Sequence, residues 1–136
     1  MEFRDEIVLK MRLTLANVSI TNNTSIEERF QNETLRPILK MQNDLFLLAF
    51  RNYIIKYKSV FYQLTLPKRL IYIEHAIQKD IKFRNSLKGM VIGHFTSVEY
   101  NTYVQNSSAL NKRMMTMLIE RLKDQVQYFE SPMLSE

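Results

Sequence analysis

Residues 38–57 read ILKMQNDLFLLAFRNYIIKY and contain neither glycine nor proline. Apolar side chains recur here at spacings of three and four residues, which is typical of an amphipathic α-helix. One predicted stripe consists of Ile38, Met41, Leu45, Leu48 and Ile55, and Phe46, Phe50 and Tyr53 widen it. Because this apolar surface is so broad, we expect the helix to lie near the centre of the fold or to be covered by a second subunit.

A capping box indicates where the preceding helix begins. Ser25–Glu28 has the form S-x-x-E, in which the serine and the glutamate each satisfy a free amide of the other, so a helix should start at Ile26. Pro37 removes one backbone hydrogen bond and disfavours helical geometry at Arg36. The helix is therefore expected to kink or restart there.

Two more helical stretches and one short one follow. Thr65 is a predicted N-cap for a second long helix, whose buried side is predicted to consist of Leu66, Leu70, Ile73, Ile77, Ile81 and Leu87. Thr96–Glu99 is a second capping box and begins a short helix. A serine of the 106–108 cluster is expected to cap the last helix, whose apolar stripe is Leu110, Met114, Met117, Leu118, Leu122, Val126 and Phe129.

The predicted fold is all-α, a small bundle of three long helices and one short helix. We expect residues 1–24 to form an N-terminal arm or short helix, 25–130 a single helical domain and 131–136 a tail. The first segment is ambiguous, because its apolar residues alternate as in a strand and also fit one helix face. A lone strand would have no partner within the chain, so a short helix or a loosely held arm is favoured.

The composition excludes several classes of function. The chain has no cysteine, which rules out disulfides, thiolate metal sites and cysteine nucleophiles. No run approaches the roughly 18–20 apolar residues of a membrane span, so no membrane partner is expected. Acidic residues stand where a secretory signal would be basic, and we therefore expect a cytoplasmic protein.

Positive charge is concentrated in the middle of the chain. Residues 51–92 contain nine basic residues and two acidic ones, a net charge of +7 within a total of +5. Aromatic residues are interleaved with these cations, a mixture that suits single-stranded nucleic acid. The candidate nucleic-acid-binding residues are Arg51, Lys56, Lys58, Lys68, Arg69, Lys79 and Lys82. The same pattern also fits a solvated helix face, with the rings in the core.

His75 and His94 are the only imidazoles, and they are the candidates for acid–base catalysis. Neither belongs to a recognisable metal-ligand spacing, so no metal site and no cofactor are predicted. Asn43 and Asn52 lie near the stripe of the 38–57 helix. Polar residues in such positions fix the register of paired helices in coiled coils.

Three blocks of sequence resemble a family of small helical bacterial proteins of unknown role. They are ERFQNETLRPILK at 28–40, YIEHAIQKD at 72–80 and NSSALNKR at 106–113, and the likeness spans about residues 25–127. Some members carry the label glyoxalase. The resemblance implies a helical protein with no securely assigned catalytic residue, and the label implies a metal-dependent lyase.

Three hypotheses about function follow. The first is a non-enzymatic helical interaction or regulatory protein that forms a homo-oligomer or binds another protein. The second is a nucleic-acid-associated factor that uses the basic segment 51–92. The third is a small metal-dependent lyase with His75 at its centre.

Overall fold

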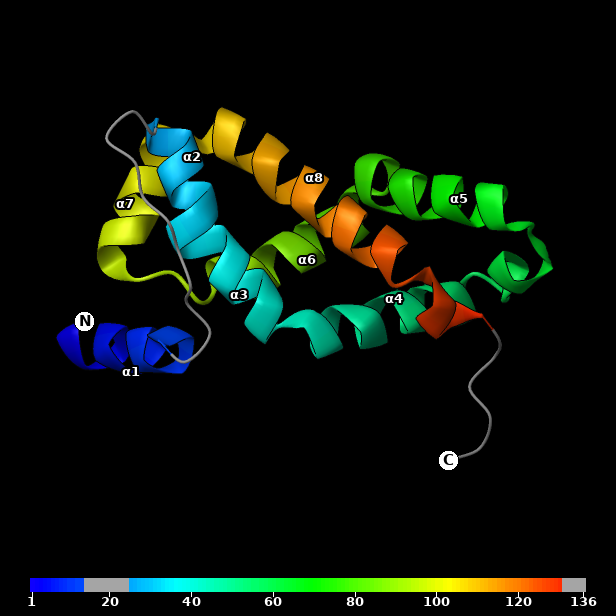
Figure 1. Ribbon diagram of the computed structural model, residues 1–136, viewed down its shortest axis with the longest axis horizontal. Coiled ribbons are helices and arrows are strands. Elements are labelled where there is room, and N and C mark those ends of the chain that lie inside the picture. The colour runs from blue at the N-terminus through cyan, green and yellow to red at the C-terminus, as the bar shows by residue number, and fades with distance from the viewer. Residues whose placement is uncertain (14–24, 131–136) are drawn as a thin grey trace.

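The computed structural model describes residues 1–13 and 25–130, and in these ranges every regular element is helical (Figure 1). The α-helices are α1 (Glu2–Leu13), α2 (Ile26–Phe30), α3 (Arg36–Met41), α4 (Asn43–Lys56), α5 (Leu66–Lys79), α6 (Ile81–Ile92), α7 (Ser97–Gln105) and α8 (Ser107–Asp124). A π-helical turn, Gln31–Leu35, joins α2 to α3, and 3₁₀ turns cover Val60–Gln63 and Val126–Phe129. The predicted all-α class is confirmed for the described residues.

The arrangement of three long helices and one short one is not confirmed, because two predicted helices are divided. The backbone leaves helical geometry at Gln42, between α3 and α4, and at Asp80, between α5 and α6. Asp80 caps α6, since its carboxylate accepts a hydrogen bond from the Phe83 amide at 3.1 Å. Pro37 stands in the first turn of α3, where its missing amide hydrogen is tolerated.

The core is built around Phe50 of α4. The rings of Phe61, Phe129, Tyr72, Phe83 and Tyr53 all lie within about 6 Å of the Phe50 ring, centroid to centroid. Helix α8 crosses the middle of the molecule in Figure 1, and its predicted stripe is largely correct. The buried residues of that stripe are Leu110, Met114, Leu118, Leu122 and Phe129.

The predicted stripe of residues 38–57 is buried only in part, so a position near the centre is wrong for some of its residues, while cover by a second subunit stays a prediction. Phe46 and Phe50 face the core, whereas Leu45, Leu48 and Ile55 remain 43%, 51% and 52% exposed. The prediction assumed one continuous helix across Gln42. Because of the break at Gln42, the side of α4 that faces the core is not the side that would continue the Ile38 face of α3.

Two residues predicted to be buried on the next long helix are also exposed. Leu66 and Ile81 are the first residues of α5 and α6, so they extend past the core that Ile73 and Ile77 fill. The interruption at Asp80 places Ile81 at a helix end instead of in the middle of a buried face.

The four predicted caps have different outcomes. Thr65 occupies the N-cap position of α5, but its side chain makes no capping hydrogen bond. The Ser25 hydroxyl accepts a bond from the Glu28 amide at 3.1 Å, and the Thr96–Glu99 capping box forms in both directions. The predicted serine cap of α8 is wrong. Asn106 occupies the N-cap position, but its side-chain amide donates to the Thr102 carbonyl at 2.8 Å instead of capping α8.

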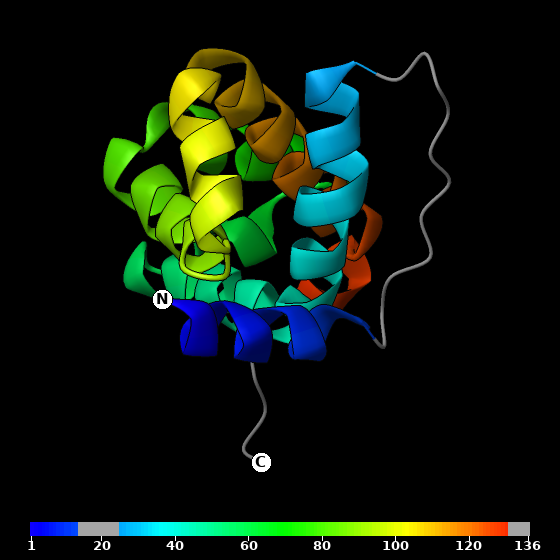
Figure 2. The same ribbon diagram turned by 90° about the vertical axis from the view of Figure 1, so that its left-hand side faces the viewer.

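Helix α1 is held against the turn between α6 and α7. Figure 2 shows it crossing below α7 and α3 at one end of the molecule. Arg12 is only 4% exposed, and its guanidinium donates to both carboxylate oxygens of Glu99, at 2.6 Å for Nη1 to Oε2. Thr34 donates to the same carboxylate at 2.7 Å. The predicted segment 1–24 is thus helical at 2–13, and its remainder, like the tail 131–136, lies outside the described residues.

Further polar contacts fix the first half of α1. Arg4 donates to the carbonyls of Gly93 and Phe95, each at 2.7 Å. The Asp5 carboxylate accepts from the Ser97 hydroxyl at 2.6 Å and from the Ser97 amide at 3.1 Å. Each of these contacts satisfies a backbone or side-chain group of the turn that leads into α7.

We expect the stability contributed by Glu99 to decline in acid. Burial alone raises the pKa of Glu99, but hydrogen bonds from Arg12, Thr96 and Thr34 outweigh burial and leave the pKa below its usual 4.5. A carboxylate with a lowered pKa stabilises the fold above its unfolded pKa, and this contribution is lost as pH falls through the folded pKa. Glu99→Gln should therefore lower the free energy of unfolding by about 3 kcal/mol at pH 7.

Urea denaturation between pH 7 and roughly pH 3 measures this effect. The difference between the wild type and Glu99→Gln should shrink as the pH falls. Glu6→Gln is the matched control, because Glu6 is an exposed carboxylate of α1. Equal effects of the two substitutions at pH 7 would contradict the role of the Arg12–Glu99 pair.

Candidate functional site

A cleft of about 710 Å³ lies beside α4, α5 and the junction of α5 with α6. We call it the aromatic–basic cleft. Its lining residues are Tyr53, Tyr57, Val60, Tyr72, His75, Ala76, Lys79, Asp80, Ile81 and Lys82. The volume falls within the range of about 300–1,000 Å³ that is typical of small-molecule sites.

Helical spacing explains one wall of the cleft. Tyr72, His75, Ala76 and Lys79 are spaced by three, one and three residues, so they lie on one side of α5. Ala76 is nearly buried and is the smallest residue of this wall. The absence of a long side chain at this position leaves room between the aromatic rings and the cations.

Asp80 organises the opposite wall. One of its carboxylate oxygens accepts from the Tyr53 hydroxyl at 3.1 Å and from the Tyr57 hydroxyl at 3.3 Å, while the other accepts from the Phe83 amide. The Tyr53 and Tyr57 rings pack with their centroids 4.6 Å apart. One acid therefore fixes two tyrosines and the start of α6.

These contacts shift the pKa values of the groups involved. The amide hydrogen bond from Phe83 lowers the pKa of Asp80, with help from the two tyrosines and against the effect of burial. Burial and the neighbouring Asp80 charge raise the pKa of Tyr53, and the Asp80 charge is the main cause of the raised pKa of Tyr57. Asp80 therefore carries its negative charge, and both phenols stay protonated, at neutral pH.

The cleft contains more basic groups than acidic ones. The side chains of His75, Lys79 and Lys82 are exposed, and no hydrogen bond or ion pair joins these side chains to the other described residues. Asp80 is occupied by the tyrosines, and Glu74 on the same helix accepts from Lys123 at 3.1 Å. The three basic side chains can therefore reach a bound anion.

The structure brings together only some of the predicted nucleic-acid-binding residues. Lys79 and Lys82 line the cleft together with His75. Lys56 lines a neighbouring hollow of about 480 Å³ between α4 and α6, which shares Tyr53, Tyr57, Asp80 and Lys82 with the cleft. These three lysines surround Asp80.

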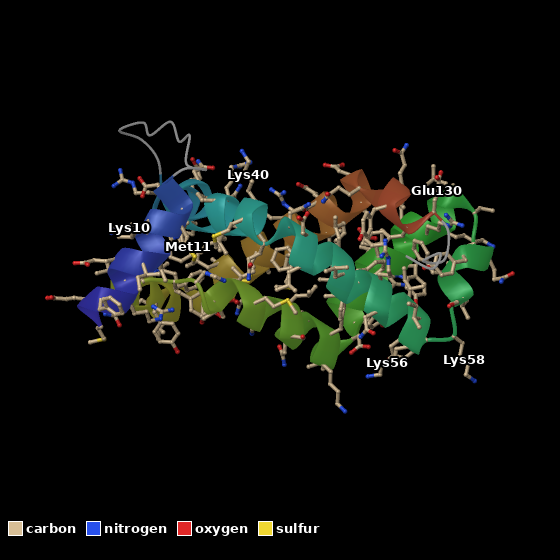
Figure 3. The ribbon with its side chains drawn as sticks, turned by 90° about the horizontal axis from the view of Figure 1, so that it is seen from below. Lys10, Met11, Lys40, Lys56, Lys58 and Glu130 are labelled. Atoms are coloured by element: carbon tan, nitrogen blue, oxygen red, sulfur yellow. The ribbon has the colours of Figure 1, made fainter. Side chains whose placement is uncertain are left out.

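The other four predicted residues lie elsewhere. Arg69 donates to the carbonyls of Tyr62 and Leu64, both at 3.1 Å, and lies over the Phe61 ring. The Arg51 guanidinium lies 4.3 Å from the centroid of the Tyr128 ring. Lys58 has positive φ in the turn that follows α4, and Figure 3 shows it projecting past the end of that helix. Lys68 is exposed in the first turn of α5.

His94 lies in the turn between α6 and α7, which contacts α1, and it does not line the cleft with His75. Its carbonyl accepts from Arg12 at 3.0 Å, and its buried Nδ1 has no hydrogen-bond partner within the described part of the chain. Burial, followed by the charges of Arg12 and Arg4, lowers the pKa of His94. Among residues 1–13 and 25–130, no three His, Asp or Glu side chains are grouped so that they could hold a metal ion.

Sequence reasoning missed Asp80 and named no tyrosine as a site residue. The interleaving of Tyr53 and Tyr57 with cations was interpreted either as a nucleic-acid signal or as part of the core, and only the basic residues were named as candidates. Asp80, three residues before the first aromatic of α6, has the position of an N-cap. Reading it as a cap would have divided the long helix and placed Lys79 and Lys82 beside the break.

Comparison with known protein families, curated proteins and solved structures finds no match to this chain. The resemblance to small helical bacterial proteins therefore stays a prediction. None of the described helices combines the length and the apolar character that crossing a membrane requires.

The charge of Asp80 should control the ionisation of its two tyrosines. Asp80→Asn keeps a side chain that can cap α6 but removes the negative charge. We expect Tyr53 and Tyr57 to ionise at lower pH in this variant, because the phenolates would no longer face a carboxylate. Absorbance at 295 nm against pH measures this shift, with circular dichroism confirming that the fold persists.

Asp44→Asn provides the control, since Asp44 is an exposed acid at the start of α4. Its titration curve should follow that of the wild type. If the tyrosine titration curves of the wild type, Asp80→Asn and Asp44→Asn coincide, the arrangement around Asp80 is refuted.

Proposed function

We propose that this chain is a non-enzymatic interaction protein that self-associates through the outer side of α4. The observation that supports this is a row of residues on that side, Leu45, Leu48, Asn52 and Ile55, spaced by three, four and three residues. We call it the α4 row. All four are exposed, although three of them are large and apolar.

The spacing of the α4 row is that of the a and d positions of a coiled coil. Two helices with apolar residues at this spacing pack side by side, with each side chain of one inserted between four of the other. Burying a half-exposed leucine or isoleucine contributes about 1 kcal/mol before the cost of association. Six such side chains in a pair of helices contribute about 6 kcal/mol before that cost, which makes them the apolar part of the attraction in a weak dimer.

Asn52 favours a second copy of this chain as the partner. In a parallel, in-register pair, the a position of one helix lies opposite the same position of the other, so Asn52 meets its own counterpart. Two amides can donate to and accept from one another. An antiparallel pair centred on the row would place Asn52 against Leu48 and leave a buried amide without a partner.

The other asparagine predicted to set register is used inside the protein. The Asn43 amide donates to the Gln125 side chain at 2.8 Å and accepts from it at 2.7 Å. Asn43 therefore links α4 to the end of α8. This leaves Asn52 as the polar residue of the exposed row.

The alternative of a metal-dependent lyase has less support, because no group of three His, Asp or Glu ligands occurs at His75 among residues 1–13 and 25–130 and His94 lies close to Arg4 and Arg12. We place the activity of the protein in the cytoplasm, where a chain without cysteine needs no disulfide framework.

Other proteins that expose a helix with the same a and d spacing are a further class of partner for the α4 row.

We expect Leu48→Glu to convert a dimer into a monomer. A glutamate at the centre of the row would be buried without a partner in the pair, and the dissociation constant should rise at least about 30-fold. Sedimentation equilibrium from 5 to about 200 μM measures the change. Ile71→Glu is the matched control, because Ile71 of α5 is 49% exposed and Leu48 is 51% exposed.

The control should dimerise as the wild type does, and both variants should keep the wild-type circular dichroism spectrum. A wild-type protein that is monomeric across this range would reject self-association. Loss of the dimer in both variants would place the contact elsewhere.

Cysteine cross-linking tests the register. The native chain has no cysteine, so each introduced thiol reports alone. Asn52→Cys should form an intermolecular disulfide rapidly under mild oxidation, because the parallel pair places the two side chains together. Ile71→Cys should form it slowly. Selective cross-linking between Leu48→Cys and Asn52→Cys proteins in a mixture would indicate an antiparallel pair and contradict the proposed register.

A further inference from the structure

We infer that the aromatic–basic cleft binds a nucleotide, that is, a planar heterocycle carrying phosphate. This site does not depend on self-association through the α4 row. Tyr53 and Tyr57 follow Asn52 by one and five residues, which turns them by about 100° and 140° around the helix from it. The cleft therefore lies on a different side of α4 from the α4 row, although Leu45, Leu48 and Asn52 of the row line the neighbouring hollow.

The charge of the cleft selects an anion. Lys79 and Lys82 have no acidic partner among the described residues, and His75 lies one helical turn before Lys79 on the same side of α5. The nearby acid, Asp80, accepts hydrogen bonds from two tyrosines and one backbone amide. A phosphate group would receive hydrogen bonds and charge from side chains that have no partner in the part of the chain that the structure describes.

The aromatic wall selects a planar ring. The Tyr57 ring packs against Tyr53 and its hydroxyl is tied to Asp80, while the side chain stays exposed to the solvent. A ring held in this way offers a stacking surface without a large loss of side-chain entropy on binding. Stacking of a base on an aromatic side chain contributes enough to distinguish a nucleotide from phosphate alone.

The dimensions fit one nucleotide, with room for a second beside it. The cleft has a volume of about 710 Å³, and the neighbouring hollow lined by Lys56 continues past Asp80 with about 480 Å³. A free nucleotide would occupy the cleft alone. A short single strand would place a second phosphate near Lys56.

Isothermal titration calorimetry at low salt with four probes tests the site: AMP, adenosine, inorganic phosphate and an eight-residue oligothymidylate. We expect AMP to bind at least about 10-fold more tightly than adenosine or phosphate, and binding to weaken as salt is added. Lys79→Ala combined with Lys82→Ala should weaken AMP binding at least about 10-fold. Lys40→Ala, an exposed lysine of α3, should leave it unchanged.

Two substitutions test the aromatic wall. Tyr57→Ala should weaken AMP more than phosphate, whereas Tyr100→Ala, an exposed tyrosine of α7, should affect neither. If Tyr57→Ala does not fold, Ile81→Glu places a negative charge at an exposed position of the cleft and should abolish AMP binding.

The binding experiments distinguish failure of the nucleotide site from failure of the proposed self-association. Repeating the AMP titration on Ile55→Glu, a substitution in the α4 row at a residue that lines neither the cleft nor the neighbouring hollow, should give the wild-type affinity, whether or not the wild type dimerises. If oligothymidylate binds more tightly than AMP and its binding depends on Lys56, the natural ligand is a single strand. If it does not, the ligand is a free nucleotide. Absence of AMP binding at millimolar concentration, affinity no greater than that for phosphate, or equal effects of the cleft and control variants would overturn the inference.

Discussion

The carboxylate of Asp80 is the interaction on which the central part of the structure depends. It ends the helical run that began at Leu66, accepts the Phe83 amide and thereby starts α6 in a new direction. It also receives the hydroxyls of Tyr53 and Tyr57 from α4. A single charged group thus links three helices and positions the rings beside the basic side chains.

Helix α4 presents three different sides to its surroundings. Phe46, Phe50 and Ile54 fill the core, Tyr53 and Tyr57 turn toward Asp80, and the α4 row faces outward. A helix that is apolar on so many sides would normally be buried all round. In this chain one apolar side remains uncovered, which is why its a and d spacing supports a partner and not only additional core.

Local signals could be predicted from the sequence, and contacts between distant segments could not. The Ser25 and Thr96 caps depend on residues three apart, and both were found from spacing alone. Asp80 was missed because Ile77 and Ile81 continue the apolar period across it. The Arg12–Glu99 pair joins residues 87 apart, and nothing in the spacing of either segment identifies the other.

The same limit applies to the candidate site. His75, Lys79 and Lys82 were predicted as candidates in two separate roles, and the structure places them around one cleft. Two of their aromatic neighbours, Tyr53 and Tyr57, come from α4 and its C-terminal end, about 20 residues earlier in the sequence. Such a grouping depends on how α4 packs against α5, which is a property of the core and not of either segment.

The basic residues divide according to the chemistry of their side chains. Arginine has a planar group with five donors and stacks on rings, whereas lysine is a compact, strongly hydrated charge. Arg4, Arg12 and Arg69 accordingly bind backbone carbonyls or a carboxylate within the protein. Among the lysines of the described residues, Lys123 alone makes a hydrogen bond or ion pair of this kind. Most of the lysines of the described residues therefore remain available to an external anion, and around Asp80 they lie next to exposed aromatic surface.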